Sequence, residues 1–193
     1  MAQFPLTPYF TLMVILLFTP MNHFNPISLA SSQAQATNET QRLENICTKT
    51  LESYECFLCI KADTSRDTND TPDLIHSLLH CMYSETNLAH INADLLSQNS
   101  SIPSLKAVLS QCSSLLFDAS NSAVDAMTKM ESNQYARAWD CAKTARRSVI
   151  RCAKVFLSNG NVTAPAPVVG PMVHAKRLYD SMHVLFQLIV CQN

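Results

Sequence analysis

Apolar residues recur every three or four positions along four long segments of the chain, and this spacing constrains the fold more than any other feature. A recurrence of three to four residues places side chains on one face of an α-helix. The pattern therefore predicts four amphipathic helices. Their apolar stripes comprise Ile75, Leu78, Leu79, Met82, Ala89, Ala93 and Leu96; Leu105, Val108, Leu109, Cys112, Leu116, Ala119, Ala123, Ala126 and Met130; Tyr135, Ala138, Ala142, Ala145, Val149, Cys152 and Phe156; and Val173, Leu178, Met182, Leu185 and Ile189.

The scarcity of glycine supports an all-α fold. The only two glycines, Gly160 and Gly170, both lie in the proline-rich connector SNGNVTAPAPVVGP at residues 158–171. A protein built from β-hairpins needs more turn glycines than this. Because the other links are short, the four helices are expected to form an antiparallel up-down-up-down four-helix bundle over residues 72–191. Residues 40–62 are expected to form a helical hairpin before the bundle.

The N-terminal region predicts secretion. The apolar run Tyr9–Phe18 is too short to span a bilayer, but it has the length of a signal-peptide core. Small residues follow it, with plausible cleavage after Ala30 or Ala34. We therefore expect a signal peptide at residues 1–30, a short linker at 31–39 and one domain at 40–193. In the oxidising secretory pathway, the eight cysteines indicate a disulfide framework.

Three cysteines crowd into the stretch ICTKTLESYECFLCI, residues 46–60. Cys56 and Cys59 have the C-x-x-C spacing of redox and zinc sites, whereas Cys47 and Cys56 could staple a hairpin. A redox site of this type needs a thioredoxin-like strand before it, and no strand pattern precedes this one. The stapled hairpin is therefore the favoured interpretation.

The bundle geometry predicts a second bridge. If the second and third helices turn back near residue 132, Cys112 and Cys152 each lie twenty residues from the turn. At about 1.5 Å per residue they sit at the same height, and both lie on an apolar stripe. If the third and fourth helices are reflected about residue 164, the middle of their connector, Cys191 lies level with residue 137, about 6 Å from Cys141. A Cys141–Cys191 bridge is therefore one candidate pairing. No geometric argument selects partners for Cys59 and Cys81.

Other motifs indicate neither catalysis nor a cofactor. His76 and His80 have the i, i+4 spacing of a helical zinc site, but Ser77 replaces the glutamate of H-E-x-x-H and no third ligand is evident. No nucleophile elbow or other catalytic motif is present. We therefore expect no metal and no enzymatic activity, and the net charge of −1 argues against nucleic-acid binding.

Two surface features remain open at this point. One is a basic stripe on the third helix, opposite its apolar face, which is either simply solvated or a docking surface for an acidic patch. The other is a set of four Asn-x-Ser/Thr sequons, which fit N-glycosylation of a secreted protein. The stripe comprises Lys143, Arg147, Arg151 and Lys154, and the sequons begin at Asn38, Asn69, Asn99 and Asn161.

At this point the sequence resembles the plant invertase and pectin methylesterase inhibitor family over about residues 40–190. The resemblance lies in the hairpin opening CTKTLESYEC, in CSSLLFDASNSAVDAM on the second bundle helix, and in a cysteine near the end of the third. It implies bridges from Cys47 to Cys56 and from Cys112 to Cys152. It also implies a non-catalytic inhibitor that docks stoichiometrically on a cell-wall or vacuolar carbohydrate-active enzyme, in the apoplast or alternatively the vacuole.

One departure from the family pattern argues against invertase as the target. Invertase inhibitors of this family carry a Pro-Lys-Phe tripeptide near the start of the third bundle helix. Asn133, Gln134 and Tyr135 stand in its place here, so only an aromatic residue is retained. Pectin methylesterase is therefore the favoured target and acid invertase the alternative. An alternative of another class is a secreted helical carrier that binds an apolar ligand within the bundle.

Overall fold

A computed structural model describes residues 40–41, 43–50, 52–160 and 162–190. They belong to one compact unit that spans Glu39–Asn193. The expected signal peptide and linker, residues 1–39, lie outside the described residues. The regular secondary structure of the described residues is entirely helical, which confirms the all-α prediction. Among these helices, none combines the length and the apolar character that a bilayer crossing needs.

A helical hairpin precedes the bundle, as expected. Its first arm covers residues 40–41 and 43–47, and its second arm is α3, Ser53–Ala62. Between the arms, the Thr50 hydroxyl donates to the carbonyl of Cys47 at 2.7 Å. Cys47 and Cys56 are both buried and form a disulfide, with their Cα atoms 5.6 Å apart. The two arms of the hairpin are thus joined by a covalent bridge, and apolar side chains of both arms are buried.

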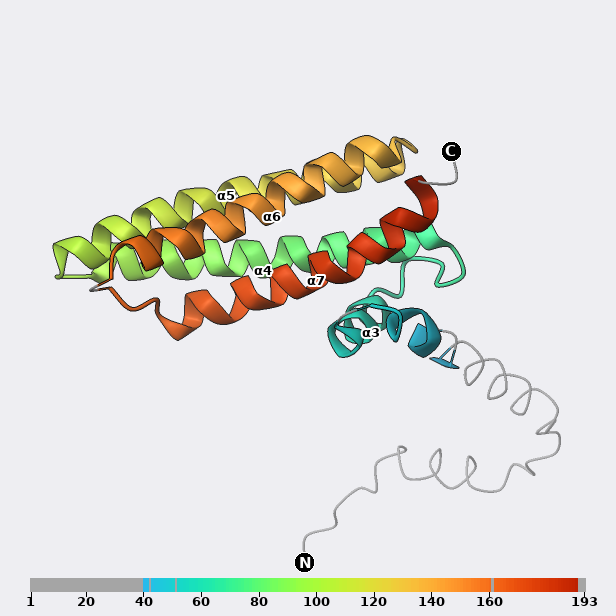
Figure 1. The fold of residues 1–193 in the computed structure, drawn as a ribbon, viewed down its shortest axis with the longest axis horizontal. Helices are drawn as coiled ribbons and strands as arrows, with labels where there is room; N and C mark the ends of the chain where they lie inside the picture. Colours follow the sequence, from blue (N-terminus) through green and yellow to red (C-terminus); the bar gives the residue numbers. More distant parts are fainter. Residues whose placement is uncertain (1–39, 42, 51, 161, 191–193) are drawn as a thin grey trace, which may run out of the picture. The chain divides into compact units, whose positions relative to one another are not determined.

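Four long helices form the bundle (Figure 1). They are α4, Thr71–Asn99; α5, Pro103–Glu131; α6, Tyr135–Ser158; and α7, Ala166–Val190. Proline occupies the first turn of α4 and α5, where its missing N–H leaves no helical bond unmade. Helix α4 packs along α5 and α7, and α5 packs along α6, whereas α6 and α7 share a smaller contact. The predicted antiparallel four-helix bundle is confirmed.

The core consists mainly of the predicted stripes. The α5 and α6 stripes are rich in alanine, and Ala119, Ala123, Ala138 and Ala142 are fully buried. Such small side chains let the two helix backbones approach closely. Four predicted core residues at the ends of the stripes are only partly buried: Leu96, Leu105, Tyr135 and Ile189.

The start of the last helix corrects the sequence-based prediction. The connector was expected to extend to residue 171, but α7 begins at Ala166 and contains Pro171. Proline has no N–H to donate to the carbonyl four residues earlier, which belongs to Pro167. That carbonyl instead accepts a hydrogen bond from Asn92 Nδ2 on α4 at 2.8 Å. Since this contact compensates for the missing helical bond, the proline-rich segment is helical. Val173, predicted to be in the core, is 40% exposed, and Met172 is buried in its place.

Polar and covalent contacts attach the hairpin to the bundle. Arg177 of α7 donates from Nη1 to Glu55 of α3 at 2.7 Å. Cys59 of α3 forms a disulfide with Cys81 of α4, and their Cα atoms are 6.2 Å apart. The hairpin is therefore held to two bundle helices by contacts that the sequence alone did not indicate.

Candidate protein-docking face

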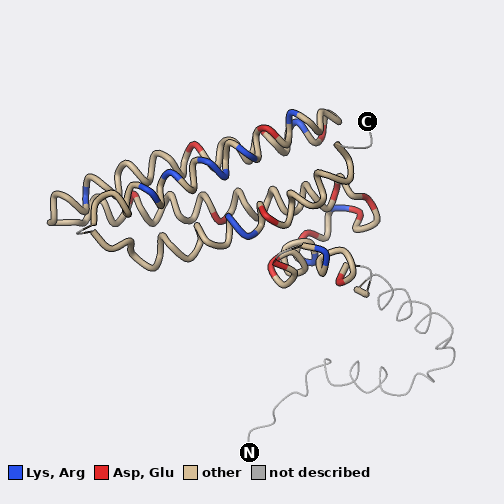
Figure 2. The backbone as a smooth tube through the Cα atoms, in the orientation of Figure 1, with Lys and Arg blue, Asp and Glu red and all other residues tan. Residues whose placement is uncertain are grey.

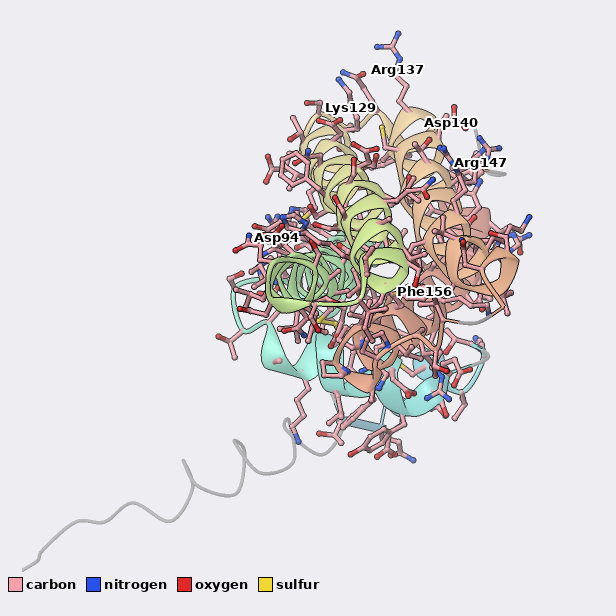
Figure 3. All side chains as sticks on the ribbon, turned by 90° about the vertical axis from the view of Figure 1, so that its left-hand side faces the viewer. Asp94, Lys129, Arg137, Asp140, Arg147 and Phe156 are labelled. Carbon is pink, nitrogen blue, oxygen red and sulfur yellow. A yellow bond between two sulfur atoms is a disulfide. The ribbon has the colours of Figure 1, made fainter. Side chains whose placement is uncertain are left out.

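Helix α6 carries a strong excess of positive charge. It contains six basic residues and one acidic residue, in a chain whose overall net charge is −1. Figure 2 shows Lys and Arg recurring along the helix. Its apolar face is buried in the bundle, so that basic side chains three and four residues apart lie together on the opposite face. Arg137 and Arg147 point away from the bundle (Figure 3).

Three of these basic residues are free to meet a partner. Arg147, Arg151 and Lys154 are exposed, and no ion pair within the described residues involves them. They are spaced i, i+4 and i+7, which aligns them along one side of the helix. We call these three residues the basic face. Of the predicted basic stripe, only Lys143 is engaged elsewhere, because it pairs with Asp140 and lies 5.6 Å from the centre of the Trp139 ring.

An aromatic cluster fixes the first half of α6 against α7. The Trp139 ring stacks on Tyr179 with centroids 5.1 Å apart, on His183 at 5.2 Å, and lies 4.9 Å from Phe186. The Arg146 guanidinium lies 4.9 Å from the centre of the Tyr179 ring and pairs with Asp180. Large aromatic contacts of this kind give a helix a well-defined position. The cluster therefore ties the part of α6 that precedes the basic face to α7.

The α5–α6 turn, where invertase inhibitors carry Pro-Lys-Phe, is closed by hydrogen bonds. Asn133 has a φ of 56°, and its N–H donates to the carbonyl of Met130 at 2.9 Å. The N–H of Gln134 donates to the carbonyl of Lys129 at 2.9 Å, which completes a Schellman helix ending. The Tyr135 hydroxyl donates to Asn133 Oδ1 at 2.7 Å. The aromatic residue at this position is thus tied to the turn.

The two histidines of the HSLLH sequence do not build a metal site in the described residues. His76 Nε2 lies 3.0 Å from Arg66 Nη2 and 3.4 Å from Glu131, whereas His80 is exposed. No group of three or more His, Cys, Asp or Glu in the described part of the chain could hold a metal ion. Burial lowers the pKa of His76, and the positive charge of Arg66 lowers it further.

Acidification is expected to destabilise the protein through His76. Because folding lowers the pKa of this imidazole, the unfolded chain binds more protons than the folded protein as the pH falls below the ordinary value of 6.5. Between about pH 7 and pH 5, the free energy of unfolding should therefore fall more steeply in the wild type than in a His76→Gln variant. Denaturation at several pH values measures this difference, with His80→Gln as the matched exposed control. Parallel curves for the wild type and H76Q would contradict it.

The cysteines of the C-x-x-C sequence belong to different bridges. Cys56 pairs with Cys47 and Cys59 pairs with Cys81, so the motif holds no dithiol. In the bundle, Cys112 and Cys152 form a disulfide with their Cα atoms 4.6 Å apart. The structure thus contains both bridges that the family resemblance implies, together with a third.

Cys141 and the sequons are only partly covered by the structure. Within the described residues Cys141 is a free thiol, and burial raises its pKa. Its suggested partner, Cys191, lies outside the described residues, as do Asn38 and Asn161. Asn69 and Asn99 are exposed, the first before α4 and the second at its last residue.

Solved structures identify the fold. No protein-family model matches the sequence, and no curated protein does. A mutant form of a pectin methylesterase inhibitor from Arabidopsis matches with a TM-score of 0.63 at 15% identity, over 76% of this chain and 95% of that chain. The chain has the fold of a pectin methylesterase inhibitor. A second solved structure, of a pectin methylesterase inhibitor from Arabidopsis thaliana, matches with a TM-score of 0.58 at 14% identity, over 77% of this chain and 95% of that one.

This similarity confirms the resemblance to the pectin methylesterase inhibitor fold. It extends over nearly the whole length of both solved inhibitors, so the hairpin and the bundle are parts of one shared architecture. At 14–15% identity, the similarity concerns the fold alone. It does not extend to the surface residues that would select a target.

Proposed function

We propose that this protein is a secreted inhibitor that docks one-to-one on a plant pectin methylesterase in the cell wall. The observation that carries the proposal is the fold match to two solved structures of a pectin methylesterase inhibitor, over 95% of the matched chain in each. The three disulfides of the described residues support an extracellular location. A vacuolar location is the alternative. We also propose that the exposed Asn69 and Asn99 carry N-glycans, as their sequons suggest.

The basic face of α6 is the proposed contact surface. Arg147, Arg151 and Lys154 lie on the exposed side of a helix of 24 residues, which is about 36 Å long at about 1.5 Å per residue. Such a helix and its neighbours could supply the roughly 800 Å² per partner of a standard protein interface. Uncompensated positive charge would speed docking on an acidic enzyme surface. Because the bundle is braced by disulfides, little conformational entropy would be lost on binding.

The α5–α6 turn favours pectin methylesterase over invertase. Invertase inhibitors of this family are expected to insert a Pro-Lys-Phe tripeptide into the active site of the target. Here the Gln134 N–H is bonded to the carbonyl of Lys129, and the Tyr135 hydroxyl to the side chain of Asn133. This turn offers neither the proline nor the lysine of the invertase-inhibitor motif. We therefore propose inhibition by coverage of the substrate cleft rather than by insertion of a loop.

Parallel titrations test the choice of target. Increasing amounts of the disulfide-intact protein are added to a plant pectin methylesterase and to a plant acid invertase, and the residual activity of each enzyme is measured. We expect the methylesterase activity to fall in a saturable way with an endpoint at one equivalent, while the invertase activity is unchanged. Saturable inhibition of invertase alone would reverse the choice of target. Inhibition of neither enzyme would contradict the proposed function.

A carrier function has one supporting observation, a groove between α6 and α7 that apolar side chains line. The groove opens to solvent, since Leu157 on its wall is 79% exposed. A carrier that shields its ligand needs an enclosed cavity. We therefore treat the groove as a ligand site on an inhibitor scaffold.

A further inference from the structure

A groove of about 480 Å³ runs between the second half of α6 and the first turns of α7. Val149, Phe156 and Met172 line it and are buried, whereas Leu157 and Val173 line it and are 79% and 40% exposed. Connector residues 160 and 162–164 also line it. Figure 3 looks onto this end of the bundle and labels Phe156. The volume lies within the usual range of small-molecule sites, about 300–1,000 Å³.

The groove follows from the way in which α7 begins. Asn92 of α4 binds the carbonyl of Pro167 and thereby holds the first turn of α7 on α4. Contacts between α6 and α7 are correspondingly few, although these helices follow each other in the chain. In the first half of α6, the large Trp139 ring fills the space toward α7. In the second half, the one aromatic residue of α6 is Phe156, which is buried and forms part of the groove wall. The space between the two helices therefore stays open there.

The groove has a positively charged edge. Lys176 is the one charged residue among the described residues that line it. Its Nζ lies 2.6 Å from Asp180 Oδ2, and Arg146 Nε lies 3.7 Å from Asp180 Oδ1. Two cations thus share one carboxylate beside an apolar groove. Among the described residues, one positive charge of this group of three is not balanced by an acidic partner, and it could attract an anion to this edge.

We propose that the groove binds one amphipathic carboxylic acid with an unbranched apolar chain. The chain would lie along Val149, Phe156 and Met172, and the carboxylate would pair with Lys176. This ligand satisfies both features of the site, because an apolar molecule without a head group would leave the charge unmatched. A purely polar anion would gain nothing from the exposed Leu157 and Val173. Binding here does not require the proposed inhibitory function.

Calorimetric titration with octanoate, decanoate and dodecanoate tests the proposal, each kept below its micelle concentration. We expect one-to-one binding to the full disulfide-intact domain, with the dissociation constant falling about fourfold for each methylene that enters the groove. Dodecanol, which lacks the carboxylate, should bind more weakly than dodecanoate. Replacement of Lys176 by methionine should reduce this preference for the acid without abolishing the binding of dodecanol.

Two matched variants on α7 locate the site. Val173→Asp places a carboxylate in the groove and should weaken dodecanoate binding at least tenfold. Leu188→Asp makes the same change at a residue that is 48% exposed and does not line the groove, so binding should be retained. Failure of dodecanoate to saturate the wild type would overturn the proposal. Equal loss of binding in V173D and L188D, with both variants folded by circular dichroism, would also overturn it.

Discussion

Replacement of Cys112 and Cys152 together by alanine is expected to lower the free energy of unfolding by about 4 kcal/mol. The bridge joins α5 to α6 across 40 residues, and its two cysteines are fully buried. A crosslink of this length removes much of the conformational freedom of the unfolded chain, so its loss stabilises the unfolded state. Alanine is preferred to serine here, because a buried hydroxyl without a partner would add a cost of its own.

The other two bridges close shorter loops, so their expected losses of unfolding free energy can be compared with this one. Cys47–Cys56 spans 9 residues and Cys59–Cys81 spans 22, for which the same relation gives about 2.5 and about 3.5 kcal/mol. Peptide mapping without reduction first establishes the three pairs, and guanidinium denaturation of each double alanine variant then measures the losses. A loss below about 1 kcal/mol for C112A/C152A would contradict the role assigned to this bridge.

Reversal of the three charges of the basic face is expected to weaken inhibition of pectin methylesterase about a hundredfold or more. The variant is Arg147→Glu, Arg151→Glu and Lys154→Glu. All three side chains are exposed and none takes part in an ion pair of the described residues, so the fold should tolerate the change. Reversal removes the attraction to an acidic enzyme surface and replaces it with repulsion. The inhibition constant, measured at low ionic strength, reports the effect.

A second triple variant separates a specific contact from net charge. Lys49→Glu, Lys61→Glu and Lys106→Glu change the total charge by the same amount at exposed residues of the hairpin region and α5. We expect this control to change the inhibition constant far less than the α6 variant does. Similar losses in both variants would indicate long-range electrostatics without a docking face. A greater loss in the control would place the contact on the hairpin or on α5.

The helices could be predicted from the sequence because their apolar spacing and their burial have the same physical origin. Leu78, Leu109, Ala142 and Met182 are all buried on the faces that the spacing indicated. The spacing of Arg147, Arg151 and Lys154 also placed the basic face correctly on the exposed side of its helix. Both inferences depend only on the helical period, which can be recognised within a single segment of the sequence.

The Cys112–Cys152 bridge between two helices was predicted from their expected turn, but several other features that depend on two or more segments were missed. The early start of α7 is accompanied by a hydrogen bond from Asn92, 75 residues before Pro167, to the carbonyl that Pro171 leaves free. The partner of Cys59 depends on how the hairpin packs on α4, which no local pattern specifies. The contact of His76 with Arg66 and Glu131 likewise brings together three separate segments. The α6–α7 groove was missed for the same reason, since two helices and a connector line it.

The mass of a complex tests the central claim most directly. The disulfide-intact protein is mixed with a plant pectin methylesterase, separated by size exclusion and measured by light scattering. At about 0.1 M salt we predict one species with the summed mass of one enzyme and one inhibitor, which dissociates as the salt approaches about 1 M and the basic face is screened. Two separate species at low salt, with all three disulfides intact, would contradict the account.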